Sequence, residues 1–121
     1  MPRDRVRVYI AGPMRGYPQM NRPTFTAAEV IILALGDRFE VENPARCPDM
    51  DGWGTEEYMA RDLPLLRQCQ WVALLPGWQR SEGARREFAC AVAHGIPTVA
   101  ITELERALDA VQEAKTSEPV S

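Results

Sequence analysis

The apolar run at residues 71–75 (WVALL) constrains the fold more than any other segment of this chain. A Pro-Gly pair follows it at once. Continuous apolar runs of this length are typical of strands buried on both faces, which occur in parallel sheets covered by helices on each side. The sequence therefore predicts a central strand of a parallel sheet.

Strand and helix patterns alternate along the rest of the chain. Further short strand patterns lie at residues 5–11, 39–43 and 98–101. Helix patterns separate and follow these strands, beginning after Asn21, at Thr55, after Ser81 and at Glu103. This alternation predicts strand–helix–strand units, and hence a parallel sheet with helices on both faces.

Local signals set the expected helix ends. Asn21 and Ser81 are placed to cap two of the helices. Pro64 lies within the helix pattern that starts at Thr55, so a kink or a restart is expected there. In the helix after Ser81, the expected apolar stripe consists of Ala84, Phe88, Ala91 and Val92.

We therefore expect an α/β fold of the flavodoxin-like kind. It would be a single-domain three-layer sandwich with a four-stranded, mostly parallel sheet in the order 2-1-3-4. A length of 121 residues leaves room for one core. Residues 1–114 are expected to form the domain and residues 115–121 a flexible tail.

Composition narrows the classes of partner. A net charge of −3 gives no electrostatic reason to expect a nucleic acid polymer or an anionic membrane, which favours a small-molecule ligand. The longest apolar run is too short to span a bilayer. Cys47, Cys69 and Cys90 are odd in number and share no CxxC spacing, so we expect a cytoplasmic protein.

Two loops should meet at the carboxyl ends of the first and third strands, where ligands bind in sheets of this order. Glycines beside an arginine in the first loop suit close approach to an anion, and the second loop leads into a helix N-terminus. The predicted substrate contacts in these loops are Gly12, Met14, Arg15, Gly16, Ser81 and Gly83, of which Arg15, Ser81 and Gly83 are expected to hold a phosphate. Taken singly, these residues also fit plain turn and cap roles.

Two acidic residues are candidates for chemistry at this edge. Glu87 lies one turn beyond Gly83 on the same helix face, and a solvent-exposed helix position is its alternative role. Asp62 precedes Pro64, and a helix cap is its alternative role. Paired carboxylates can cleave glycosidic bonds, with one attacking or stabilising the anomeric carbon and the other handling the proton of the leaving group.

Linked motifs across residues 6–101 resemble the nucleoside 2-deoxyribosyltransferase superfamily and, more narrowly, its short DUF4406-like branch. These motifs are VYIAGPMRG at residues 8–16, YMARDL at 58–63, LPGW at 75–78, Ser81, Gly83, EFACA at 87–91 and GIP at 95–97. The resemblance implies that Glu87 is a nucleophile toward C1′ of a sugar. It also implies that Asp62 acts on the base or sugar, and that Tyr9 lies near the nucleophile.

The residue six positions before the nucleophile separates subfamilies of this group. Transferases that act on free nucleosides carry an aspartate there, whereas the nucleotide N-glycosidases carry a serine. This chain has Ser81, and Arg15 has a similar setting in the nucleotide hydrolases. The chain departs from the usual pattern at Ala89, where a glycine is common, and at Arg85 and Arg86, which replace small residues.

The loop at residues 46–54 is expected to recognise the base, through Asp49, Asp51 and a stacking Trp53. Trp78 is a further candidate contact beside the phosphate loop. Packing against the core is the alternative role for both tryptophans. Cys90 and His94 are four residues apart, but they have no further ligands at suitable spacing, so no metal is predicted.

The resulting expectation is hydrolysis of the N-glycosidic bond of a nucleoside or deoxynucleoside 5′-monophosphate, with no cofactor. The resemblance implies a homodimer or higher oligomer, because relatives complete their sites with a neighbouring subunit. Two alternatives stay open: a deoxyribosyltransferase that acts on free nucleosides, and a nonenzymatic module that binds a nucleotide or a related signal.

Overall fold

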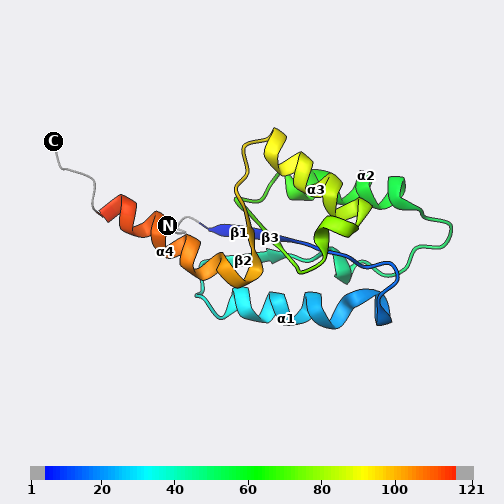
Figure 1. Ribbon diagram of the computed structural model, residues 1–121, viewed down its shortest axis with the longest axis horizontal. Helices are drawn as coiled ribbons and strands as arrows, with labels where there is room; N and C mark the ends of the chain where they lie inside the picture. The colour runs from blue at the N-terminus through cyan, green and yellow to red at the C-terminus, as the bar shows by residue number, and fades with distance from the viewer. Residues whose placement is uncertain (1–4, 117–121) are drawn as a thin grey trace.

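The computed structural model describes residues 5–116 of the chain. It has an α/β, Rossmann-like architecture with a four-stranded, all-parallel sheet in the order β2-β1-β3-β4 (Figure 1). The strands are β1 (Val6–Ala11), β2 (Phe39–Glu42), β3 (Trp71–Leu74) and β4 (Thr98–Ala100). The predicted fold class and strand order are confirmed.

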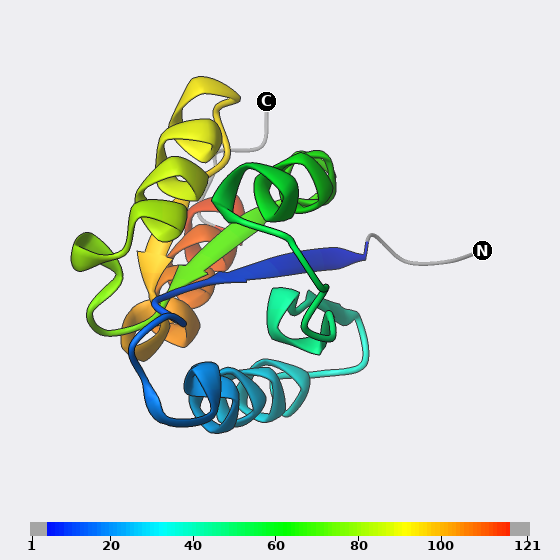
Figure 2. The same cartoon turned by 90° about the vertical axis from the view of Figure 1, so that its right-hand side faces the viewer.

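Helices cover both faces of this sheet (Figures 1 and 2). The long helices are α1 (Arg22–Leu33), α2 (Thr55–Leu66), α3 (Glu82–Ala93) and α4 (Leu104–Thr116). Residues of α1 and α4 pack in the core on one face, and residues of α2 and α3 pack on the other. No helix within residues 5–116 is long and apolar enough to cross a membrane.

The two central strands are buried on both faces, as the apolar run predicts. In β1, Val8 and Ile10 face α1, whereas Tyr9 and Ala11 face α2 and α3. These four side chains are fully buried. Alternation along a strand thus sends the hydroxyl of Tyr9 into the layer that contains α3.

The ends of β1 and β3 lie very close together. The N–H of Leu75 donates to the carbonyl of Ala11 at 2.8 Å, which extends the pairing one residue beyond β3. A Cβ atom on Gly12 would lie only 2.7 Å from the Cβ of Leu75. A larger residue at position 12 would therefore force these two strand ends apart.

Asn21 does not cap α1 through its side chain, which corrects one prediction. It precedes Arg22 directly, but its backbone is left-handed, with φ of 62°. Its amide donates instead to the carbonyl of Pro13 at 2.8 Å. Asn21 therefore ties the start of α1 to the loop after β1. By contrast, Ser81 caps α3 as expected, accepting from the N–H of Ala84 at 3.1 Å.

Other local details differ from the predictions. The expected restart at Pro64 does not occur: α2 continues to Leu66, and Pro64, which has no N–H, removes one intrahelical hydrogen bond two residues before the helix ends. Val92 is 59% exposed, because Glu87 completes the buried stripe of α3 with Ala84 and Ala91. Helix α4 ends at Thr116 instead of Ala114; the flexible tail stays a prediction, and residues 117–121 lie outside the described residues.

Candidate active site

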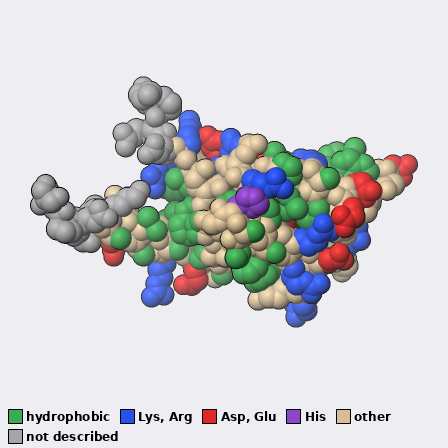
Figure 3. Space-filling model, turned by 90° about the horizontal axis from the view of Figure 1, so that it is seen from above, with side chains coloured by type: hydrophobic (Ala, Val, Ile, Leu, Met, Phe, Trp, Pro, Cys, Tyr) green, Lys and Arg blue, Asp and Glu red, His purple; other side chains and the backbone are tan. Residues whose placement is uncertain are grey.

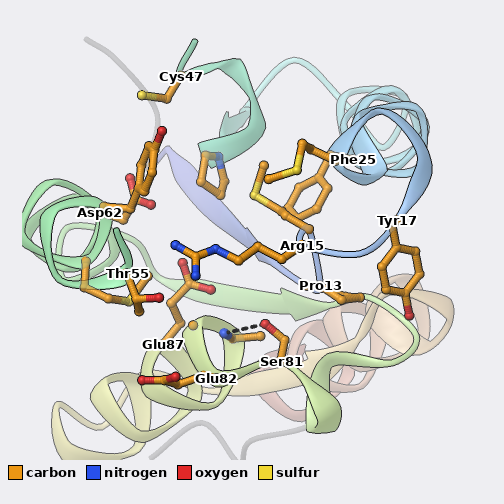
Figure 4. A pocket seen from close by; sticks show the side chains of 18 of the residues that line it. Pro13, Arg15, Tyr17, Phe25, Cys47, Thr55, Asp62, Ser81, Glu82 and Glu87 are labelled. Atoms are coloured by element: carbon orange, nitrogen blue, oxygen red, sulfur yellow. Dashed lines mark hydrogen bonds between the residues drawn. The ribbon is translucent and has the colours of Figure 1, made fainter. Parts of the chain in front are cut away.

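A cavity of about 310 Å³ opens at the carboxyl edge of the sheet (Figure 4). Its walls are the loop after β1, the start of α1, the loop after β2, and the first turns of α2 and α3. This is the edge at which the strand order reverses, where α/β sheets bind ligands. A cavity of roughly 300 Å³ lies at the small end of the usual range for small-molecule sites.

The structure brings most of the predicted site residues together around this cavity. Those that line it are Gly12, Met14, Arg15, Asp62, Ser81, Gly83 and Glu87. Tyr9 lies beneath the cavity and reaches it through Glu87, to which its hydroxyl donates a hydrogen bond. Residues far apart in the sequence thus meet in one place.

Four other predicted contacts lie outside the lining: Gly16, Asp51, Trp53 and Trp78. Trp53 packs edge-on against Tyr58, with ring centroids 5.0 Å apart. Trp78 stacks on Phe88 at 4.7 Å. Trp78 therefore takes the core-packing role that was its alternative, whereas Trp53 packs against Tyr58, an aromatic side chain of the cavity wall.

Glu87 is a buried carboxyl group with one side-chain hydrogen-bond partner among the described residues. It is 4% exposed, and its partner is the hydroxyl of Tyr9. Burial raises the pKa of Glu87 to about 8; the hydrogen bond from Tyr9 opposes this shift, and the charge of Asp62 adds to it. Glu87 thus changes charge near neutral pH, which is unusual for a glutamate.

Tyr9 acts as a donor because it stays protonated. Burial, followed by the nearby charges of Glu87 and Asp62, raises the pKa of Tyr9 well above its usual value. Its hydroxyl is fully buried within the layer of α2 and α3. Tyr9 therefore fixes the orientation of Glu87 without competing for its proton.

Asp62 projects from α2 toward the same cavity and is 5% exposed. Burial raises the pKa of Asp62, and Arg61 partly offsets this effect through an ion pair of 2.5 Å between Nη1 and Oδ1. Because Asp62 lies inside α2, it has no helix to cap. Its alternative role is thereby excluded.

Arg15 extends across the cavity toward Glu87 (Figure 4). The structure shows no ion pair between Arg15 and an acidic side chain of the described residues. Beside it, Ser81 and Gly83 bring the first turn of α3 to the cavity wall. This part of the site offers positive charge and backbone N–H groups.

The two arginines that depart from the pattern of the resembling family stay out of the cavity. The guanidinium of Arg86 contacts both carboxylate oxygens of Glu56 on α2, at 2.6 and 3.2 Å. Arg85 is exposed and donates to the carbonyl of Gln79 at 3.3 Å. These arginines therefore leave the size of the cavity unchanged, and Arg86 joins α2 to α3.

Sequence reasoning missed several lining residues. They include Tyr17, Arg22, Cys47, Tyr58 and Arg80, whereas Asp49, expected in the base-recognition loop, does line the cavity. Tyr58 lies one helical turn before Asp62, so helical spacing alone could have identified it. Arg80 directly precedes Ser81, so its position next to a predicted phosphate contact could have identified it. Arg22 at the start of α1 and Asp49 in the loop after β2 form an ion pair of 2.9 Å, which no local pattern indicates.

A buried polar cluster supports the loop after β2, and sequence reasoning missed it as well. Glu29 of α1 accepts from the amide of Asn43 at 2.9 Å and forms an ion pair with Arg46. Asn43 also accepts from the N–H of Ala45 at 2.9 Å. This cluster holds the turn at Pro44–Arg46, directly before Cys47 in the cavity wall.

The expected absence of a metal site concerned Cys90 and His94. His94 lies on the surface (Figure 3), directly after the last residue of α3, and its Nδ1 is 2.8 Å from the carbonyl oxygen of Cys90. Within residues 5–116, no group of three or more histidine, cysteine, aspartate or glutamate side chains is arranged to hold a metal ion.

Comparison with known proteins gives one match. A family model described as a domain of unknown function, DUF4406, matches residues 6–100, which include the whole sheet and the lining residues named above. No curated protein and no solved structure shows significant similarity to the chain. A match over this much of the sequence shows that the chain belongs to the DUF4406 family.

Proposed function

We propose that this protein hydrolyses the N-glycosidic bond of a nucleoside or deoxynucleoside 5′-monophosphate, with Glu87 as nucleophile. The observation that carries the proposal is the placement of Glu87, buried at the wall of a nucleotide-sized cavity, held by Tyr9 and electrostatically coupled to Asp62. The resemblance to nucleoside 2-deoxyribosyltransferases supports the same chemistry.

The order of the groups along the cavity supports this substrate. In Figure 4, Asp62 lies at one end, Tyr17 at the opposite end, and Glu87 and Ser81 between them. A nucleotide has the same linear order of base, sugar and phosphate. The base would lie toward Asp62 and Tyr58, C1′ would face Glu87, and the phosphate would lie toward Ser81.

The first chemical step forms a glycosyl ester. An oxygen of the ionised Glu87 carboxylate bonds to C1′ while the bond from C1′ to the base nitrogen breaks. The electron pair of that bond leaves with the base, which takes a proton from the carboxyl group of Asp62. Burial favours the protonated form of Asp62, which suits it to this role.

Water completes the reaction in the second step. The Asp62 carboxylate accepts a proton from a water molecule whose oxygen bonds to C1′. The ester bond from C1′ to Glu87 breaks, and its electron pair returns to the carboxylate. The products are the free base and the sugar 5-phosphate, and both acidic residues regain their starting protonation states.

Ser81 favours a phosphorylated substrate over a free nucleoside. The first turn of α3 presents a hydroxyl and N–H groups, which are complementary to a phosphate dianion. An aspartate at the same position would repel it. Arg15 adds a positive charge on the facing wall.

The test follows free base from a panel of ribo- and deoxyribonucleosides and their 5′-monophosphates by reversed-phase chromatography. We expect release from monophosphates, with a loss of about a thousandfold or more in Glu87→Gln, because the amide cannot act as the nucleophile. Glu105→Gln, an exposed glutamate on α4, is the matched control and should match the unmodified protein.

Two results would contradict the proposal. Release from nucleosides alone, with base exchange when a second base is added, would indicate a transferase. Binding of nucleotides with no base release from any substrate, and no effect of Glu87→Gln on affinity, would indicate a binding module.

A further inference from the structure

The outer end of the cavity is built around Gly77, in the loop between β3 and α3. Its backbone is left-handed, with φ of +86°. A Cβ atom at this position would lie 2.8 Å from the hydroxyl of Tyr17 and 3.5 Å from Nη2 of Arg80. Because Gly77 has no side chain, the hydroxyl of Tyr17 and the guanidinium of Arg80 can both lie close to its backbone.

Neither of these two groups has an acidic partner among the described residues. Within residues 5–116, no carboxylate forms an ion pair with Arg80, whereas Arg22 on the same cavity pairs with Asp49 at 2.9 Å. Glu82 also lines the cavity, but it is exposed and forms no ion pair with Arg80 in this structure. An uncompensated guanidinium beside a hydroxyl donor suits an anion.

The position of this pair matches the phosphate end of the proposed substrate. Arg80 directly precedes Ser81, and Tyr17 lies at the opposite end of the cavity from Asp62 (Figure 4). Arg15, by contrast, extends toward Glu87. Arg80 and Tyr17 are therefore better placed than Arg15 to reach the outer oxygens of a phosphate held at Ser81.

We propose that Arg80 and Tyr17 form the outer half of a phosphoryl-binding subsite and select 5′-monophosphates over nucleosides. The assignment of a nucleotide rests on the proposed function, whereas phosphate binding by this pair does not. A phosphate monoester carries close to two negative charges at pH 7. Arg80 would supply a charge-assisted, bidentate contact, and Tyr17 a single hydroxyl donor.

The first experiment measures binding of inorganic phosphate by isothermal titration calorimetry, and requires no catalysis. We expect Arg80→Ala to weaken phosphate binding by about tenfold or more and Tyr17→Phe by about threefold to tenfold, as for hydrogen bonds to charged groups. Arg80→Lys should recover part of the loss because it keeps the charge. Arg67→Ala, an exposed arginine at the end of α2, is the matched control.

The second experiment compares substrates. We expect Arg80→Ala to raise KM for a 5′-monophosphate by about tenfold or more while kcat stays within about twofold, because the contact is the same in the ground and transition states. The kcat/KM for the matching nucleoside should not change. Thermal unfolding of each variant checks that the loop variants are folded.

The outcomes separate the two proposals. Loss of phosphate affinity in Arg80→Ala without base release from any substrate would support this subsite and overturn the proposed function. Base release that depends on Glu87 but is insensitive to Arg80, with unchanged phosphate affinity, would overturn the subsite alone. Equal losses for nucleoside and monophosphate would also overturn it, because they indicate a general defect.

Discussion

Glu29 and Glu87 are both buried glutamates in the middle of a helix, but their surroundings differ. Glu29 lies on α1 and receives a hydrogen bond from Asn43 and an ion pair from Arg46. Glu87 lies on α3, and the hydroxyl of Tyr9 is its one side-chain hydrogen-bond partner among the described residues. One carboxylate is therefore paired with a cation and the other is not.

This difference separates a structural acid from a reactive one. A buried carboxylate with cationic and amide partners stabilises a fixed arrangement, and here it holds the loop after β2 against α1. Glu87, a buried carboxyl group without a cationic partner, has a raised pKa and faces a cavity in which a ligand could contact it. Burial alone does not identify a functional acid; the set of partners does.

The largest expected effect concerns stability and pH. The pKa of Glu87 is raised from 4.5 to about 8, so its stabilising contribution is full below pH 4.5 and is lost as pH rises toward 8. The free energy of unfolding should fall by about 3–5 kcal/mol relative to Glu87→Gln over this range, at about 1.4 kcal/mol per pKa unit. Urea unfolding of both proteins at pH 5, 7 and 9 measures it; parallel pH profiles would contradict it.

The second prediction removes the structural acid. Glu29→Ala should lower the free energy of unfolding by about 2 kcal/mol, mainly because it leaves the buried amide of Asn43 without an acceptor, whereas the exposed Arg46 can return to solvent. Glu29→Gln should lose less, since its amide oxygen can still accept from Asn43. Urea unfolding at pH 7 measures both, with Glu105→Ala as control. An unchanged midpoint in Glu29→Ala would show that this cluster contributes nothing.

The smallest expected effect comes from Tyr9, which tunes the reactive acid. Its hydrogen bond lowers the pKa of Glu87, so Tyr9→Phe should raise that pKa further, by up to about one unit. For the unmodified enzyme, kcat/KM should follow a bell-shaped pH profile, because the first step needs Glu87 ionised and Asp62 protonated. The limb of this profile that reports Glu87 should move to higher pH in Tyr9→Phe. A shift to lower pH, or none, would contradict this role.

Much of this fold could be predicted because its signals are local. The apolar run that includes Val72 and Leu74 predicts a doubly buried strand, and the cap at Ser81 predicts the start of α3. The edge of the sheet that carries the cavity follows from strand order, which the alternating pattern constrains. Helical spacing from Gly83, position near Pro64 and the resemblance of the motifs indicated Glu87 and Asp62, which the structure brings to one cavity.

The remainder depends on contacts between distant segments. Glu29 looks like an ordinary helix former in the sequence, and only folding brings it to Asn43, fourteen residues later. Tyr17 and Arg80 come from different loops that meet over Gly77. Trp53 is a residue type that often stacks on bases, yet here its ring packs edge-on against Tyr58. No periodicity encodes such pairings, because they depend on how loops pack.

The contact between Gly12 and Leu75 has a consequence for altering the specificity of this protein. Since a Cβ at position 12 would lie 2.7 Å from that of Leu75, the floor of the cavity cannot be remodelled without moving the strand ends that carry both loops. Directed evolution toward other substrates should therefore leave Gly12 constant. Cys47 and Asp49, which line the cavity from the loop after β2, are better positions for randomisation.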